Sequence, residues 1–158
     1  MNISLVYFFL GLSTFEPTID IIQNEADFIS VVNISSTIIE GENYFKASPV
    51  HQIRGKNYTS FRLWLEGNSI VSDGQYVIFY NLCENIGYPV LKEDGIFEVK
   101  NGTITVVVGS NRKNIMVKSL KNWLSKNGMF QDIFFHECLA GRKGLPMTER
   151  AEAPGSQL

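Results

Sequence analysis

The chain has 158 residues, of which 44% are hydrophobic and 19% are charged, and its formal net charge at pH 7 is −2. This length suits one domain with a buried core, and the composition argues against a wholly disordered chain. Residues 1–45 hold six acidic residues and no Lys or Arg, whereas residues 46–126 hold eleven basic and six acidic residues. A basic middle of this kind is compatible with a polyanionic partner, although it is more often a solvated surface.

The chain begins with an apolar run, Ile3–Leu12. This run is too short to span a bilayer as a helix, and it lacks the preceding positive charge that is typical of a signal peptide. Glycosylation triplets at Asn33, Asn57 and Asn101 nevertheless keep a secreted protein open as an alternative. We expect residues 1–27 to form an apolar and acidic lead-in, and we expect no contact with a membrane.

Sequence that favours β-strands begins at residue 28. The β-branched run Phe28–Ile39 predicts a long first strand with a bend at residues 33–36, and Gly41 supplies the turn after it. A second, weaker strand is predicted over Ala47–Arg54. Its Pro49 favours a position at the beginning or the edge of a strand, because proline cannot donate a hydrogen bond to a neighbouring strand.

The stretch from Tyr58 to Leu82 carries the two most clearly patterned strands. Between Thr59 and Glu66 the side chains alternate with a period of two, which is typical of a half-buried strand. One face would carry Phe61, Leu63 and Leu65, and the other would carry Arg62 and Trp64. After the turn pair Asp73-Gly74, the β-branched and aromatic run Gln75–Leu82 predicts a strand that is buried on most of its surface.

The region after residue 82 combines turn residues with two further elements. Gly87, Pro89 and the cluster around Gly95 predict a long exposed loop between Cys83 and Lys100, with Ile96-Phe97 as an alternative strand extension. Asn101-Gly102 predicts a hairpin turn, after which residues 103–108 would form the last strand of the sheet. Asn114–Lys126 has the spacing of an amphipathic helix.

This succession of elements predicts a mainly β fold. The order of five strands followed by a helix is that of a small closed Greek-key barrel with a C-terminal amphipathic helix. The barrel and the helix would occupy residues 28–130. Residues 131–158 end in Gly, Pro, Arg and Glu without periodicity, and we expect them to form a poorly structured tail.

The two strand regions match a known family. The runs SFRLWLEGNSIVSDGQYVIFYNL and VKNGTITVVVGSNRKNI resemble the OB-fold domains of replication protein A-like single-stranded-DNA-binding proteins. The resemblance covers about residues 28–117 and is a pattern of strands and glycines. The matching positions are Phe61, Leu63, Trp64, Gly74, Val77, Gly102, Ile104 and Val106.

The resemblance implies a nuclear, non-enzymatic OB-fold module that binds single-stranded DNA, a partner protein subunit, or both, in DNA repair or genome maintenance. Single strands would lie across strands 2 and 3, with bases stacked on aromatic rings and phosphates held by cations. Arg62 and Trp64 would supply one cation and one ring. The rim would be supplied by Arg54, Lys56 and Tyr58 near the second turn and by Arg112 and Lys113 after the last strand.

Other interpretations of these residues stay open. Trp64 and Tyr58 would serve equally well to cover the core, and Arg62 would find an acidic partner in Glu66 or Glu98. The acidic first third also favours an OB-fold that binds a protein and has no affinity for single strands. The alternative outside this family is a secreted small β-barrel that binds an apolar ligand or a protein surface.

Catalytic and metal-binding patterns are absent from the sequence. His51 and His136 are isolated, and the chain contains no phosphate-binding loop and no hydrolase or zinc-protease motif. Cys83 and Cys138 lack the spacing of zinc ligands. We therefore expect no catalytic residue, no metal and no cofactor. Cys83 is most simply a small core residue, while a single disulfide is the alternative in a secreted protein.

Overall fold

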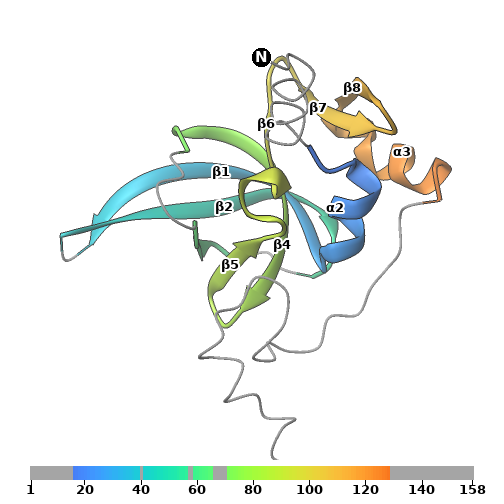
Figure 1. Cartoon of the computed structure of the whole chain (residues 1–158). Coiled ribbons are helices and arrows are strands. Elements are labelled where there is room, and N and C mark those ends of the chain that lie inside the picture. The colour runs from blue at the N-terminus through green and yellow to red at the C-terminus, as the bar shows by residue number, and fades with distance from the viewer. Residues whose placement is uncertain (1–15, 40, 57–58, 66–70, 129–158) are drawn as a thin grey trace, which may run out of the picture.

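The structure, a computed structural model, describes residues 16–39, 41–56, 59–65 and 71–128. The predicted signal-like run and the predicted tail lie outside these residues, as does Tyr58. The described residues form a mainly β fold (Figure 1). In chain order the elements are α2 (Ile19–Glu25), β1 (Phe28–Ile39), β2 (Glu42–Arg54), β3 (Phe61–Leu63), β4 (Gly74–Cys83), β5 (Ile86–Pro89), the 3-10 helix η1 (Lys92–Gly95), β6 (Ile96–Glu98), β7 (Thr103–Val108), β8 (Asn111–Met116), the 3-10 helix η2 (Val117–Ser119) and α3 (Leu120–Lys126).

Five strands pair in a closed ring. β1 pairs with β2, β2 with β3, β3 with β5, and β5 with β4, which pairs in turn with β1. The pairing of β3 with β5 is parallel, and the other pairings of the ring are antiparallel. This arrangement is an OB-fold-like barrel, and the α3 helix follows it, so the predicted fold class is confirmed.

The strand that completes the ring is not the one predicted from the sequence. β5 lies inside residues 83–100, where a long exposed loop was expected, and its Gly87, Tyr88 and Pro89 are buried. Gly87 fits there because a Cβ atom at this position would overlap the ring of Phe61. Residues 103–108 do form a strand, β7, but β7 pairs with β8 in a separate hairpin.

The predicted helix over Asn114–Lys126 begins later than expected. Asn114–Met116 belongs to β8, whose ladder with β7 continues to the last residue of that strand, and a 3-10 turn separates it from α3. Pairing with β7 prevails because it buries Ile115 beside Ile104. On α3 itself, Leu120 and Leu124 are buried, in keeping with the predicted amphipathic character of the helix.

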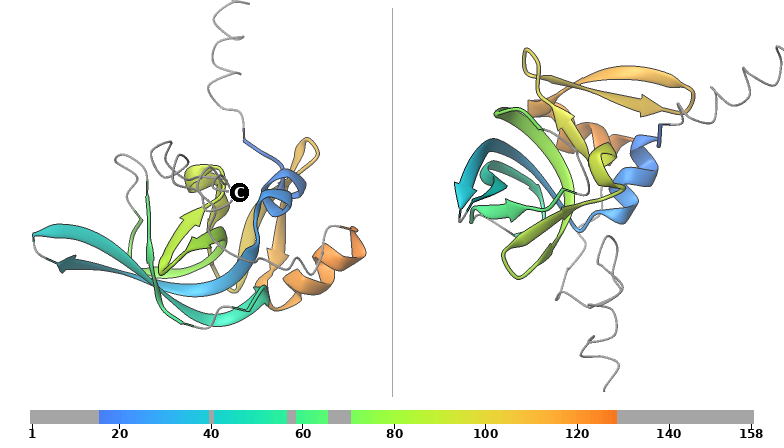
Figure 2. Two further views of the ribbon diagram at one scale, coloured as in Figure 1. Left: turned by 90° about the horizontal axis from the view of Figure 1, so that it is seen from below. Right: turned by 60° about the vertical axis from the view of Figure 1, so that its left-hand side comes forward.

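Two separate hydrophobic clusters lie on the two faces of β4. Tyr76, Ile78 and Tyr80 point into the barrel, whereas Val77 and Phe79 belong to a second cluster outside it. This second cluster is covered by α2, the β7–β8 hairpin and α3, which lie on the same side of the barrel in both views of Figure 2. Burial on both faces explains why β4 is apolar along most of its length.

The lead-in expected over residues 1–27 includes part of this second cluster. Ile19 and Ile22 of α2 are 0% and 2% exposed and pack against the outer side of the barrel. The packed unit therefore extends at least from Ile19 to Leu124.

The β1 and β2 strands are longer than the segments of them that pair within the barrel. β1 pairs with β4 over residues 28–34, and β2 pairs with β3 over residues 45–47, so the remainder of the hairpin projects beyond the barrel as a two-stranded arm (Figure 1). Register irregularities lie between Ile29 and Ser30 and between Val31 and Val32, slightly before the predicted bend. The arm extends the β2–β3 side of the barrel.

Candidate nucleic-acid interface

The outer face of β2 and β3 carries two cations side by side. Lys46 of β2 is the direct cross-strand partner of Arg62 of β3, and both residues are exposed. The flanking residues Ala47 and Phe61 are also paired with each other, and both are buried. Because side chains alternate along a strand, this inward pair places Lys46 and Arg62 together on the outer face.

An aromatic ring fixes the position of Arg62. The guanidinium carbon of Arg62 lies 4.0 Å from the centroid of the Tyr44 ring, a cation–π distance. Glu98, one expected partner of Arg62, instead forms an ion pair with Lys100, with 3.3 Å between Glu98 Oε2 and Lys100 Nζ. The other expected partner, Glu66, lies outside the described residues.

Lys46 and Arg62 therefore form a like-charge pair. Neither cation forms an ion pair with an acidic residue in the part of the chain that the structure describes. Like charges directly opposite each other on neighbouring strands destabilise a sheet, and an anion bound between them would relieve the repulsion.

An aromatic pair lies just beyond the end of β3. Trp64 is 38% exposed, and its ring centroid lies 5.6 Å from that of Tyr88 at an interplanar angle of 38°. The Trp64 amide donates a hydrogen bond of 2.9 Å to the carbonyl oxygen of Gly87, which fixes β3 against β5. Trp64 thus covers Tyr88 with part of its ring and leaves the rest accessible to a ligand.

A groove of about 380 Å³ lies at the end of this face where the arm begins. Its walls come mainly from β2, β3 and the turn between β4 and β5, in which Glu84 adopts a positive φ of 55°, and single residues of β1 and β5 complete the lining. In an OB-fold these are the strands and one of the loops that hold oligonucleotides. The lining residues are Thr37, Tyr44, Phe45, Lys46, Ser60, Phe61, Arg62, Glu84, Asn85 and Ile86.

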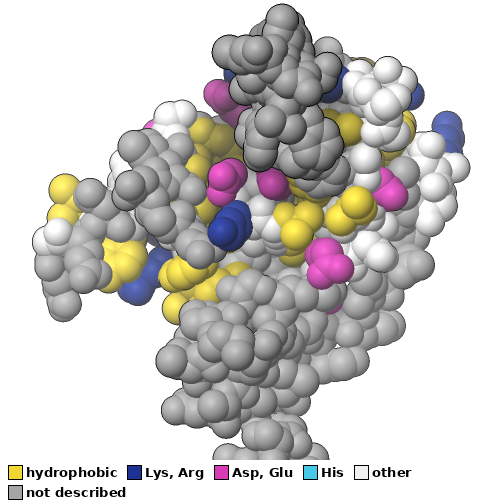
Figure 3. Space-filling view, in the orientation of Figure 1, with side chains coloured by type: hydrophobic (Ala, Val, Ile, Leu, Met, Phe, Trp, Pro, Cys, Tyr) yellow, Lys and Arg dark blue, Asp and Glu magenta, His cyan; other side chains and the backbone are white. Residues whose placement is uncertain are grey.

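Acidic side chains gather on a different face of the molecule. They are visible over η1 and α2 in the space-filling view (Figure 3). Partial burial, together with repulsion from Glu93 and Glu16, raises the pKa of Asp94 above its ordinary value. This concentration of negative charge disfavours a polyanion on the η1 face, so the cationic β2–β3 face is the better candidate interface.

Arg54 does not belong to the predicted rim, because it is 1% exposed. One terminal nitrogen of its guanidinium donates to the carbonyl oxygens of Gln23 and Ala26 at 2.7 and 3.0 Å, and the other donates to Gln23 Oε1 at 2.8 Å. These carbonyl groups lie at the end of α2, where a helix leaves acceptors unpaired. The structure therefore gives Arg54 a role in holding α2 against the barrel.

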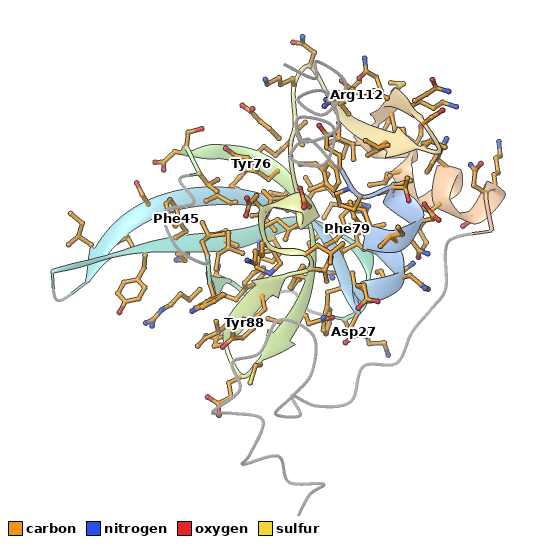
Figure 4. All side chains as sticks on the ribbon, in the orientation of Figure 1. Asp27, Phe45, Tyr76, Phe79, Tyr88 and Arg112 are labelled. Atoms are coloured by element: carbon orange, nitrogen blue, oxygen red, sulfur yellow. The ribbon has the colours of Figure 1, made fainter. Side chains whose placement is uncertain are left out.

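The other rim residues are not brought together. Lys56 is exposed just after β2. Arg112 and Lys113 lie on β8, and Figure 4 shows Arg112 on the opposite side of the barrel from Phe45 of β2. Arg112 also forms an ion pair with Glu16. Neither β8 residue can contribute to the rim of the β2–β3 face.

Two residues of this face, Tyr44 and Lys46, were missed from the sequence. The prediction began the second strand at Ala47, whereas β2 begins at Glu42. The alternation that continues backward from Ala47, with Phe45 packed against the inner cluster and Lys46 exposed, was the signal that would have found them.

Other chemistry receives little support from the described residues. They contain no group of three or more His, Cys, Asp or Glu side chains that could hold a metal ion. Cys83 is disulfide-bonded, and the other cysteine of the chain, Cys138, lies outside the described residues. None of the described helices is long and apolar enough to cross a membrane.

Comparisons with protein-family models, curated proteins and solved structures found no match. The candidate interface therefore rests on its own geometry.

Proposed function

We propose that this chain binds single-stranded DNA across the outer face of β2 and β3. The observation that carries the proposal is the pairing of Lys46 with Arg62 beside an accessible groove. A phosphate between these cations would neutralise their repulsion, and bases would stack on the exposed part of Trp64 and beside Tyr44. Each stacked base contributes about 1–3 kcal/mol in proteins of this kind.

The biological setting follows from the resemblance to replication protein A-like proteins. It is consistent with a non-enzymatic module in the nucleus that acts in DNA repair or genome maintenance, alone or with a partner protein subunit. If the same face binds a protein instead, the domain will have no affinity for single strands, and the binding experiment separates these two functions.

The proposal is tested by fluorescence anisotropy of a labelled thymidine oligonucleotide at several salt concentrations. We expect salt-sensitive binding by the parent chain, because phosphate contacts release bound counterions. Replacing both Lys46 and Arg62 with Ala should lower the affinity about tenfold or more and reduce the slope of log affinity against log salt by about 1 to 1.5. Trp64→Ala should weaken binding without changing this slope.

Lys100→Ala is the matched control, because Lys100 is also exposed but is paired with Glu98. This variant should bind like the parent. Undetectable binding by the parent at low salt, or equal binding by the parent and the Lys46 and Arg62 variant, would refute the proposal.

The disulfide at Cys83 favours a second candidate function, a secreted β-barrel that binds a protein surface or an apolar ligand. Disulfides persist mainly in oxidising compartments. The N-terminal residue of the protein from its natural source separates the two candidates. A chain that begins at Met1 supports the nuclear module, whereas a chain that lacks residues 1–13 supports the secreted barrel.

A further inference from the structure

A second cationic surface lies on the other side of the barrel, on β8, η2 and α3. Residues 109–128 contain five Lys or Arg residues and no Asp or Glu. We define the β8–α3 surface by Lys113, Lys118, Lys121, Trp123 and Lys126. All four of these lysines are exposed, while Trp123 is half-buried against the outer hydrophobic cluster.

The two elements that build this surface are held in contact. Lys113 and Ile115 share one face of β8, and Ile115 packs in the same cluster as Leu120 and Leu124 of α3. The Lys113 ammonium nitrogen consequently lies 5.9 Å from the centroid of the Trp123 ring. The helical spacing of Trp123 and Lys126 places a further cation beside the same ring.

This surface is distinct from the β2–β3 face. The outer hydrophobic cluster and β4 lie between the two, and Arg112, which lies next to Lys113 in sequence, is neutralised by Glu16. In Figure 3, dark blue side chains stand at the end of the molecule that carries β8 and α3 and again beside the β1–β2 arm, with acidic side chains between them.

We infer that the β8–α3 surface is a second contact for the phosphate backbone of nucleic acid and engages strands that extend beyond the β2–β3 face. This inference rests on the proposed function, because it assigns a further region of the same partner to a second surface. Cations around an aromatic ring suit a single strand, since the ring stacks a base while the cations hold phosphates. The exposed amide of Asn122 adds a neutral hydrogen-bond donor.

The experiment compares two oligonucleotides on the full chain, one of about 6 and one of about 30 thymidines, because single OB-folds cover about 4–16 nucleotides. A variant with Lys118, Lys121 and Lys126 all replaced by Gln should bind the short strand like the parent. It should lose about tenfold or more in affinity for the long strand at low salt, and the salt slope for the long strand should fall by about 2. A variant with Lys92 and Lys100 replaced by Gln, which removes two charges outside this surface, is the control and should bind both strands like the parent.

The variant with Lys46 and Arg62 replaced by Ala tests the proposed function, whereas the Gln variant tests this inference, so the two can fail separately. Loss of long-strand binding in the Gln variant, together with retention of short-strand binding, supports the inference. Equal long-strand affinity of the Gln variant and the parent overturns it, even if the Lys46 and Arg62 variant is impaired. Displacement of the long strand by poly-glutamate of equal charge as effectively as by unlabelled oligonucleotide also overturns it, in favour of an acidic protein partner.

Discussion

Arg54→Met is expected to lower the free energy of unfolding by about 3–5 kcal/mol, because it removes the charged donor of several buried acceptors, and each buried group left unsatisfied costs about 1–3 kcal/mol. The guanidinium makes three hydrogen bonds with Gln23 and Ala26, and its removal leaves the carbonyl groups at the end of α2 buried without their donor. Methionine keeps much of the side-chain volume, so the effect reports the lost hydrogen bonds more than a cavity. Urea unfolding followed by far-ultraviolet circular dichroism measures the change.

Lys56→Met is the control for this substitution, because Lys56 lies two residues farther along the chain and is exposed. We expect it to change the stability by less than about 0.5 kcal/mol. An Arg54→Met protein as stable as the parent would show that Arg54 does not hold α2 in place.

Phe61→Ala is expected to destabilise the barrel by about 3–5 kcal/mol, as is typical of a buried phenylalanine. Phe61 is 2% exposed, and its ring stacks on Tyr80 with the centroids 4.7 Å apart, so it joins β3 to β4 across the barrel interior. Gly87 lies against the same ring. Because glycine has no side chain, it cannot fill the space that removal of the ring would leave. The same urea unfolding experiment measures the loss.

Phe61→Leu provides a graded comparison, since it retains most of the apolar contacts and should cost roughly 1–2 kcal/mol. Ile38→Ala serves as the surface control, because Ile38 on the arm is 72% exposed. If Phe61→Ala and Ile38→Ala had equal effects, Phe61 would not be part of the barrel core. β3 has only three residues, and Arg62 directly follows Phe61 in it. Loss of the Phe61 ring should therefore shift Arg62 and also weaken DNA binding.

The strands that were predicted correctly are those whose burial leaves a local pattern. β1 and β4 are apolar because they are covered on both faces, and β3 alternates because one face points inward and the other outward. β5 was missed because its residues Ile-Gly-Tyr-Pro have the chemistry of a turn. It becomes a strand through distant partners, such as the Arg62 amide, which donates a 3.0 Å hydrogen bond to the Asn85 carbonyl oxygen beside it.

The residues of the candidate site were likewise predicted where a local pattern marks them and missed where distant contacts decide. Arg62 and Trp64 were predicted on one face by alternation, and in the structure Arg62 of β3 and Trp64 just after it are both exposed. Arg54 was misassigned because a sequence does not reveal that distant helix carbonyls surround a cation. Lys46 was missed because the start of β2 was placed too late, and its position opposite Arg62 depends on the register between β2 and β3.

The most direct test of the central claim is a titration of the isotopically labelled chain with a short thymidine oligonucleotide, followed by amide correlation spectra. We predict that the largest shift changes will lie at residues 44–48, 60–64 and 84–86, which include the groove and the pairing of Lys46 with Arg62. A spectrum unchanged at saturating oligonucleotide, or one whose changes are confined to β8 and α3, would contradict DNA binding at the β2–β3 face.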